Sequence, residues 1–123
     1  MVDVLAVLKE ELIDNLKLNY CFKKYNKPKI SYPYVIGEYI ETSKTNEDNR
    51  KIGQIILSIF TRNSILEIEN VADKIENHFQ FFCKEKRKSI VSIEYENRIP
   101  NDTNDDEIKK IEVYLNFNKW KGE

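Results

Sequence analysis

The amino-acid sequence predicts an α+β fold, with elements in the order α-β-β-α-β-β and helices packed on an antiparallel sheet. Two stretches carry apolar residues at steps of three and four, which is the spacing of one helix face. Four further stretches are rich in β-branched and aromatic residues or alternate apolar with polar residues, and they occur as two consecutive pairs. The length of 123 residues is typical of one domain, so we expect a single domain over residues 1–123.

Composition argues against several classes of protein. Twenty Lys and Arg against twenty-one Asp and Glu give a net charge of −1, with a pI near 6.0. A dedicated nucleic-acid-binding protein usually carries a strong excess of positive charge, which this chain lacks. The near-neutral charge also argues against a polybasic membrane anchor. Three glycines leave little material for a phosphate-binding loop. We therefore expect no membrane partner and no specific nucleic-acid partner.

The N-terminal sequence and the two cysteines indicate the cellular location of the protein. The apolar start of the chain is interrupted by Asp3, Lys9 and Glu10 before the core of a signal peptide or a membrane span can form. Cys21 and Cys83 have no metal-binding spacing, and two reduced, partly buried thiols are favoured over a disulfide. The sequence thus predicts a protein that is cytoplasmic or is assembled in the cytoplasm.

A first helix is predicted from about Asp3 to Leu18. Asp3 can serve as the N-cap, because its carboxylate can accept hydrogen bonds from free amides of the first turn. Pro28 and Pro33, in the lysine-rich segment that follows, oppose a longer helix. The apolar face is formed by Val4, Leu5, Leu8, Leu12 and Leu16.

The first pair of strands is predicted at Tyr34–Thr42 and Ile52–Arg62. The intervening segment Ser43–Lys51 is polar throughout and too long for a two-residue turn, so we expect an extended loop at the tip of a hairpin. Alternation along the second strand places Ile55, Leu57 and Ile59 on one face and Ile56, Ser58 and Phe60 on the other. Both faces are apolar, so we expect one to meet the core and the other to meet a helix or a neighbouring subunit.

A second helix is predicted to begin at Ser64. Ser64 and Glu67 have the spacing of a capping box, in which the side chain of each residue accepts a hydrogen bond from the backbone amide of the other. Cations at 84–88 are expected to end the helix, where they would favour the helix dipole. The core stripe of this helix is predicted to comprise Ile65, Ile68, Ala72, Ile75, Phe79 and Phe82.

The last two strands are predicted at Ser89–Ile99 and Glu107–Asn118, from their alternation of apolar and polar residues. The connector Pro100–Asp106 contains several acidic residues. It lacks the glycine and the distal glutamate of a calcium-binding loop, so we interpret it as a solvated loop.

Residues with catalytic potential are few. His78 is the single histidine, and its place beside the core stripe favours a boundary residue over a catalytic base. No motif of a nucleophile, zinc site or phosphate loop is present. We therefore predict that the protein is not an enzyme, with no catalytic residue, no metal site and no cofactor. Two groups of lysines, at Lys23–Lys29 and Lys84–Lys88, are what a nucleic-acid-binding module would use if they formed one basic face.

An ordered series of motifs extends from Tyr32 to Phe82, about half of the chain. It comprises YPYVIGEYIET, a polar gap, GQIILSIFTR, and a helix that begins SILEIENVADKIENHF. In this order the segment resembles the tail-completion or tail-terminator family of tailed phages. The residues that carry the resemblance are Pro33, Tyr34, Val35, Ile36, Gly37, Glu38, Thr42, Ile59, Phe60, Arg62, Ile68, Val71, Ile75 and Phe79.

The resemblance implies a structural protein of virion assembly. Members of this family form a ring, typically hexameric, that caps the head-proximal end of the tail tube, stops its polymerisation and offers a docking surface to the neck or head. The implied partners are further copies of the chain and the tail tube protein, with a sheath or neck protein as additional candidates. The implied location is a virion or a phage-tail-like particle such as a bacteriocin, contractile tails included, assembled in the host cytoplasm.

The polar tip of the first hairpin is the predicted site of assembly contacts. A ring larger than a dimer needs two different complementary patches on each subunit, and a polar extension can order on a partner. A head–tail joining protein of the neck and, in a different class, a small nucleic-acid-binding module remain as alternatives. The candidate contact residues are Ser43, Lys44, Thr45, Asn46, Glu47, Asp48, Asn49, Arg50 and Lys51.

Overall fold

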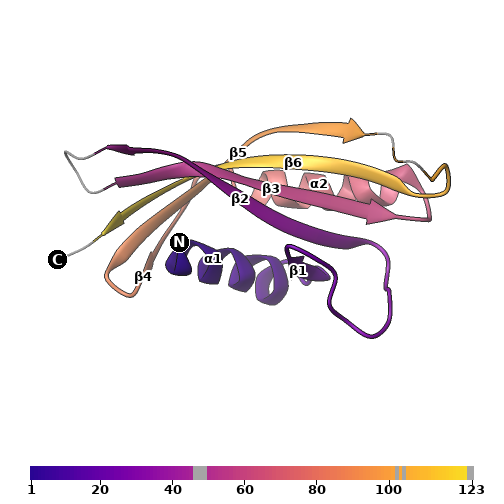
Figure 1. Cartoon of the computed structure of the whole chain (residues 1–123), viewed down its shortest axis with the longest axis horizontal. Helices are drawn as coiled ribbons and strands as arrows, with labels where there is room; N and C mark the ends of the chain where they lie inside the picture. Colours follow the sequence, from indigo (N-terminus) through magenta and orange to yellow (C-terminus); the bar gives the residue numbers. More distant parts are fainter. Residues whose placement is uncertain (46–49, 102, 104, 122–123) are drawn as a thin grey trace.

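Six strands form one twisted sheet in the computed structural model, which describes residues 1–45, 50–101, 103 and 105–121 (Figure 1). Their order across the sheet is β1-β2-β3-β6-β5-β4, so the short strands β1 and β4 lie at opposite edges. The strands are β1 (Tyr20–Phe22), β2 (Tyr34–Thr45), β3 (Arg50–Thr61), β4 (Phe82–Lys86), β5 (Ser89–Asn101) and β6 (Lys109–Lys121). The helices are α1 (Val2–Lys9), which continues as the π-helix η1 (Glu10–Asn15), and α2 (Ile65–His78).

The predicted fold class is wrong. The chain is mostly β, and within the described ranges two short helical segments accompany the sheet. The sheet is mixed and not antiparallel, because β1 runs parallel to β2. The four predicted strands are present, but β1 and β4 are additional, and they occupy residues that the sequence assigned to a connector and to the end of the second helix.

The first helix differs from its prediction in both length and geometry. It is α-helical only to Lys9 and then widens into η1, which ends at Asn15 and not near Leu18. Asp3 lies inside the first turn, and its carboxylate accepts a hydrogen bond from the Ser89 hydroxyl at 3.0 Å instead of capping the helix. The buried face comprises Val4, Val7, Leu8, Glu11 and Leu12.

The start of α2 matches the sequence in part. The Ser64 hydroxyl accepts a hydrogen bond from the amide of Leu66 at 3.1 Å, as an N-cap does. Glu67 does not complete the capping box, since its carboxylate accepts from the Thr61 hydroxyl at 2.5 Å. Of the predicted stripe, Ile68, Ala72, Ile75 and Phe79 are fully buried. Ile65 is exposed and Phe82 belongs to β4.

The sequence placed the end of the second helix too late, because the tight turn at Arg87–Lys88 is built from residues that are unusual in such turns. Arg87 and Lys88 both have positive φ, 51° and 68°, and they link Lys86 to Ser89 as a two-residue hairpin turn. Asparagine and glycine are the residues usually found in such turns, since left-handed backbone costs other residues about 1–2 kcal/mol each. The basic residues at 84–88 therefore form an edge hairpin and do not end a helix.

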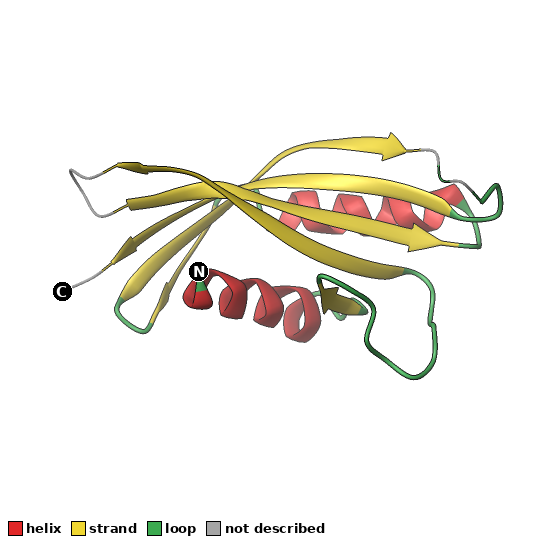
Figure 2. Ribbon diagram, in the orientation of Figure 1, coloured by secondary structure: helices red, strands yellow, loops and turns green. Residues whose placement is uncertain are grey.

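The core lies on one face of the sheet, where both helical segments pack (Figure 2). Ile55, Leu57 and Ile59 share this face, as predicted, and they are fully buried on it. The neighbouring strand β6 adds Ile111, Val113, Leu115 and Phe117. The opposite face, which we call the outer face, carries Ile56, Ser58 and Phe60 and is not covered by a helix anywhere in the described ranges.

Candidate assembly surfaces

The predicted assembly loop is in large part an extension of the sheet. Ser43–Thr45 ends β2, and Arg50–Lys51 begins β3, with Ser43 paired to Ile52 and Thr45 paired to Arg50. The remaining candidates, Asn46, Glu47, Asp48 and Asn49, lie outside the described residues. The prediction of a loop over the whole segment is therefore wrong, because backbone pairing continues well into it.

This extension lies at one end of the sheet. In Figure 1 it lies beyond the N-terminus of α1, on the same side as the end of β6 and the β4–β5 hairpin. Arg50 pairs with Trp120 and Lys51 with Lys119 of β6, and we call residues 43–45 and 50–51 the arm. At the base of the arm the Thr42 hydroxyl donates to the carbonyl of Ile52 at 3.2 Å. Gly53 follows at a close approach of two strands, where a Cβ would lie 2.2 Å from the carbonyl oxygen of Ile40. Only glycine fits there, which fixes where the arm leaves the core.

A shallow hollow lies on the outer face near the β1–β2 edge. Tyr34 and Phe60 stack at its floor with ring centroids 5.1 Å apart, and Tyr25 tilts against Tyr34 at 4.8 Å. Burial by these neighbours raises the pKa of the Tyr34 hydroxyl. The hollow has a volume of about 340 Å³, and we call it the tyrosine hollow. Its lining comprises Lys23, Tyr25, Tyr34, Ile36, Glu38, Ser58, Phe60, Lys110 and Glu112.

An apolar patch lies near the opposite edge, beside β4. Phe81, in the connection from α2 to β4, is 96% exposed, although phenylalanine is normally among the most buried residue types. A hollow of about 270 Å³ adjoins it, lined also by Cys83, Glu94 and Trp120. We call these four residues the Phe81 patch.

A buried carboxylate joins the N-terminal helical segment to the rest of the fold. The Glu11 side chain is 4% exposed and accepts hydrogen bonds from His78 Nε2 at 2.8 Å, Asn15 Nδ2 at 2.7 Å and Lys84 Nζ at 3.1 Å. Burial raises the pKa of Glu11, but these three hydrogen bonds outweigh burial, so the pKa lies below its usual value. Because the ionised carboxylate can only accept, the proton of the imidazole sits on Nε2.

Sequence analysis missed this cluster, although one signal was present. Glu11 follows Val4 by seven residues and Leu8 by three, which places it on the apolar face of the first helix. Its contact with His78 crosses 67 residues and could not be seen in the sequence. His78 itself is a boundary residue, as predicted, with its side chain 25% exposed and its ring against Phe79 and Phe82.

A second ionic cluster lies where β5 bends at its bulge. Arg98 reaches three carboxylates of α2, with its guanidinium 3.0 Å from both Glu69 and Asp73 and also bonded to Glu76. Burial lowers the pKa of Arg98, but the hydrogen bonds that its guanidinium donates to Tyr95, Glu69 and Asp73 outweigh burial, so the pKa lies above its usual value. This cluster fastens α2 to the sheet, and it leaves α2 with more negative than positive charge.

The two lysine groups do not form one basic face. Lys23–Lys29 follows β1, whereas Lys84 and Lys86 lie on β4 at the other edge of the sheet. Lys84 is bonded to Glu10 and Glu11, and Lys86 to Glu10, so these charges are neutralised within the molecule. The arrangement that would favour a nucleic-acid-binding module is therefore not formed by the described residues.

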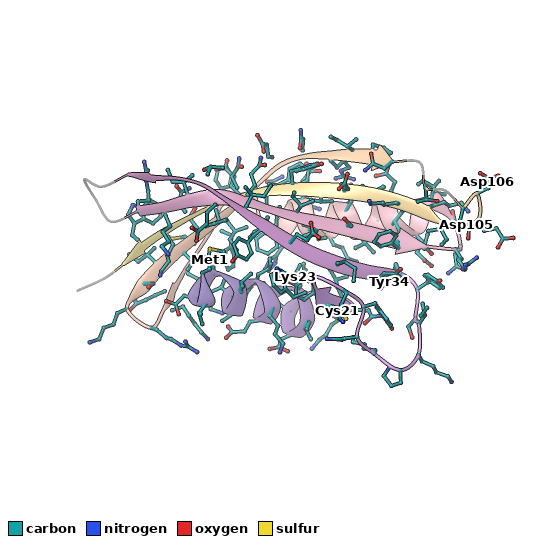
Figure 3. All side chains as sticks on the ribbon, viewed as in Figure 1. Met1, Cys21, Lys23, Tyr34, Asp105 and Asp106 are labelled. Atoms are coloured by element: carbon teal, nitrogen blue, oxygen red, sulfur yellow. The ribbon has the colours of Figure 1, made fainter. Side chains whose placement is uncertain are left out.

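The remaining candidate functional residues do not form a common site within the described ranges. In the acidic connector, Asp105 and Glu107 pair with Arg62 at 3.5 and 2.9 Å, and Asp102 lies outside the described residues. Figure 3 labels Asp105 and Asp106 in this connector. Within the described ranges, no group of three or more His, Cys, Asp or Glu side chains is placed to hold a metal ion. Cys21 is buried and Cys83 is exposed, both as free thiols on strands at opposite edges. No described helix has the length and apolar character needed to cross a bilayer.

Comparison with known proteins gives no relative: no family model matches the chain, and no curated protein matches it significantly.

Proposed function

We propose that the protein is a structural assembly subunit of a phage tail or phage-tail-like particle, a tail terminator. In this role copies of the chain form a ring on the head-proximal end of the tail tube, stop its polymerisation and offer a docking surface to the neck or head. The observation that carries the proposal, beside the resemblance of residues 32–82, is the arm, in which the polar end of the β2–β3 hairpin extends the sheet beyond the helical segments.

The arm is suited to contact another molecule. The strands β2 and β3 are each 12 residues long, and the fully buried apolar side chains of β3 lie between Ile55 and Ile59, outside the arm. Arg50 and Lys51 therefore lie outside the buried core, and strand pairing with β2 and with Lys119 and Trp120 of β6 holds them in register. Polar segments that a rigid scaffold presents in this way commonly carry binding functions.

The sheet also leaves long strand edges for neighbouring subunits. β1 pairs with β2 only at Val35–Gly37, and β4 pairs with β5 only at Ser89–Ile93. Beyond these short partners, no described strand pairs with the outer edges of β2 and β5. Edges of this kind readily accept another chain, which supports assembly of several copies.

Shortening the arm tests the proposal. Lys44–Lys51 would be replaced by Asn-Gly, which joins the paired residues Ser43 and Ile52 by a two-residue turn. We expect a folded subunit, because the buried core is untouched, but tails longer than normal in negative-stain images of particles assembled with this variant. A matched control replaces the other hairpin turn, Arg87–Lys88, by Asn-Gly and should give tails of normal length.

Two results would contradict the proposal. Tails of normal length and normal joining to heads with the short-arm variant would mean that the arm is only a connector. Tails of normal length that fail to join heads would instead identify a neck protein.

A further inference from the structure

We propose that the tyrosine hollow is a saccharide-binding site, in which the pyranose ring of a neutral sugar packs on the aromatic floor. The inference goes beyond the proposed function and does not rest on it. It stands on an aromatic surface fixed by strand register, on polar groups beside that surface that have no partner within the described residues, and on a lining whose formal charges cancel.

The floor of the hollow is set by the register of three strands. Tyr34 of β2 pairs with Phe60 of β3, and Phe60 pairs with Lys110 of β6, so these side chains form one row across the outer face. The Tyr34 and Phe60 rings stack with their centroids 5.1 Å apart and together make one aromatic surface. Side chains on paired strands hold a binding geometry more precisely than side chains on loops. The surface is therefore formed before a ligand arrives.

The wall of the hollow is also held in place. Tyr25, in the loop after β1, tilts against Tyr34 with the ring centroids 4.8 Å apart. The Tyr25 hydroxyl donates a hydrogen bond to the carbonyl of Lys29 at 2.5 Å and accepts one from the amide of Ser31 at 3.2 Å. A side chain that is fixed in this way loses little entropy when a ligand packs against it. Figure 3 shows Lys23 and Tyr34 on this part of the molecule.

The next row of the outer face supplies polar groups. Ser58 pairs with Ile36 and with Glu112, and all three residues line the hollow. Glu112 accepts hydrogen bonds from Asn101 and Tyr114, both through Oε1. Within the described part of the chain, Oε2 of Glu112 and the Ser58 hydroxyl have no hydrogen-bond partner, so both are available to a ligand.

The charges of the lining cancel. Lys23 and Lys110 are matched by Glu38 and Glu112. Among the described residues, neither lysine and neither glutamate forms an ion pair, and Lys110 Nζ lies 5.5 Å from the centre of the Phe60 ring. The hollow thus presents ammonium donors and carboxylate acceptors side by side. A charged ligand would meet like charge from one of the two pairs, whereas a neutral ligand with both donors and acceptors can use all four groups.

A pyranose ring matches this combination. Its faces carry C–H groups, which pack on the electron-rich faces of aromatic rings, and its hydroxyl groups both donate and accept hydrogen bonds. The volume of about 340 Å³ is at the lower end of the range of about 300–1,000 Å³ that is usual for small-molecule sites. A nucleotide base would also stack on the floor, but Glu38 and Glu112 would repel its phosphate. The lining therefore favours a neutral sugar over a nucleic acid.

Titration of the purified protein with neutral disaccharides tests the inference by amide NMR spectroscopy. The probes are maltose, cellobiose, lactose and N,N′-diacetylchitobiose, and we expect at least one of them to shift the amide signals of residues that line the hollow. Ser58→Arg, which fills the hollow from the outer face of β3, should abolish these shifts. Glu38→Ala removes an exposed acceptor and should weaken binding about tenfold. Glu94→Ala, an exposed glutamate that does not line this hollow, is the matched control and should bind as the wild type does.

Several results would overturn the inference. Amide signals that do not shift with any of the four disaccharides would do so, and so would shifts that persist in Ser58→Arg when circular dichroism shows that this variant is folded. If Ser58→Arg does not fold, equal binding by Glu38→Ala and Glu94→Ala would overturn it instead. Binding of oligothymidylate in preference to the disaccharides would identify a nucleic-acid site. None of these results changes tail length, so the proposed function is tested separately by the short-arm variant.

Discussion

Substitution of Glu11 by glutamine should destabilise the protein in a pH-dependent way. The carboxylate is 4% exposed and holds three donors, from η1, α2 and β4. Glutamine keeps the shape of the glutamate side chain and one acceptor oxygen. Its NH₂ group, however, would replace the second oxygen and would face a hydrogen-bond donor instead of accepting from it. A hydrogen bond to a charged group contributes about 1.5–3 kcal/mol, and one such bond is lost, so we expect the free energy of unfolding to fall by about 1.5–3 kcal/mol at pH 7.

The sign of the pH dependence follows from the lowered pKa of Glu11. A carboxyl with a folded pKa below its unfolded value of about 4.5 stabilises the folded state fully above that pH, and the contribution is lost as the pH falls through the folded pKa. The difference between wild type and Glu11→Gln should therefore shrink as the pH falls below about 4.5.

Urea unfolding followed by circular dichroism at a series of pH values measures this difference. Glu85→Gln, on the exposed outer face of β4, is the matched control and should unfold as the wild type does. A difference that stays below about 0.5 kcal/mol at pH 7, or one that does not shrink in acid, would refute the role assigned to the Glu11 cluster.

Three further predictions concern single side chains. Phe79→Ala should lower the free energy of unfolding by about 3–5 kcal/mol, because the ring is fully buried against His78 and Phe82, and a loss below about 1 kcal/mol in urea unfolding would contradict the assigned core. Lys88→Gly should raise the thermal midpoint by a few degrees, since φ of 68° costs a lysine about 1 kcal/mol, and an unchanged or lower midpoint in a thermal melt would count against a strained turn. His78→Gln should cost only about 1 kcal/mol, because the new amide can still donate to Glu11, and tails assembled with it should have normal length in negative-stain images; longer tails from a folded variant would refute a purely structural role.

The elements that the sequence predicts well are those with a strong local pattern. The buried face of β3 and four residues of the α2 stripe follow from periodicity alone, and Ser64 follows from the chemistry of an N-cap. Each of these features is decided by residues within a few positions of one another.

The elements that the sequence misses depend on contacts between distant segments. β1 has three residues and exists only because it pairs with β2. β4 begins three residues after Phe79, so its Phe82 continues the helical spacing although it faces the core from a strand. A short strand recruited by a neighbour has no periodicity of its own, and these two strands are what turn the predicted α+β fold into a mostly β one.

The candidate assembly site also combines a feature that local sequence predicts with features that depend on distant contacts. The polarity of the segment 43–51 predicts a loop, but it hides the strand pairing that extends β2 through Ser43–Thr45 and begins β3 at Arg50–Lys51. The Phe81 patch and the tyrosine hollow combine residues from several strands, and alternation of single strands could not bring them together.

The most direct test of the account is to locate the protein on assembled tails. Electron micrographs of tails made with a gold-labelled copy of the chain should show label at one end of each tube, the end that faces the head, in a ring with a fixed number of subunits. Label distributed along the tube, at the opposite end, or absent from finished tails would contradict the account.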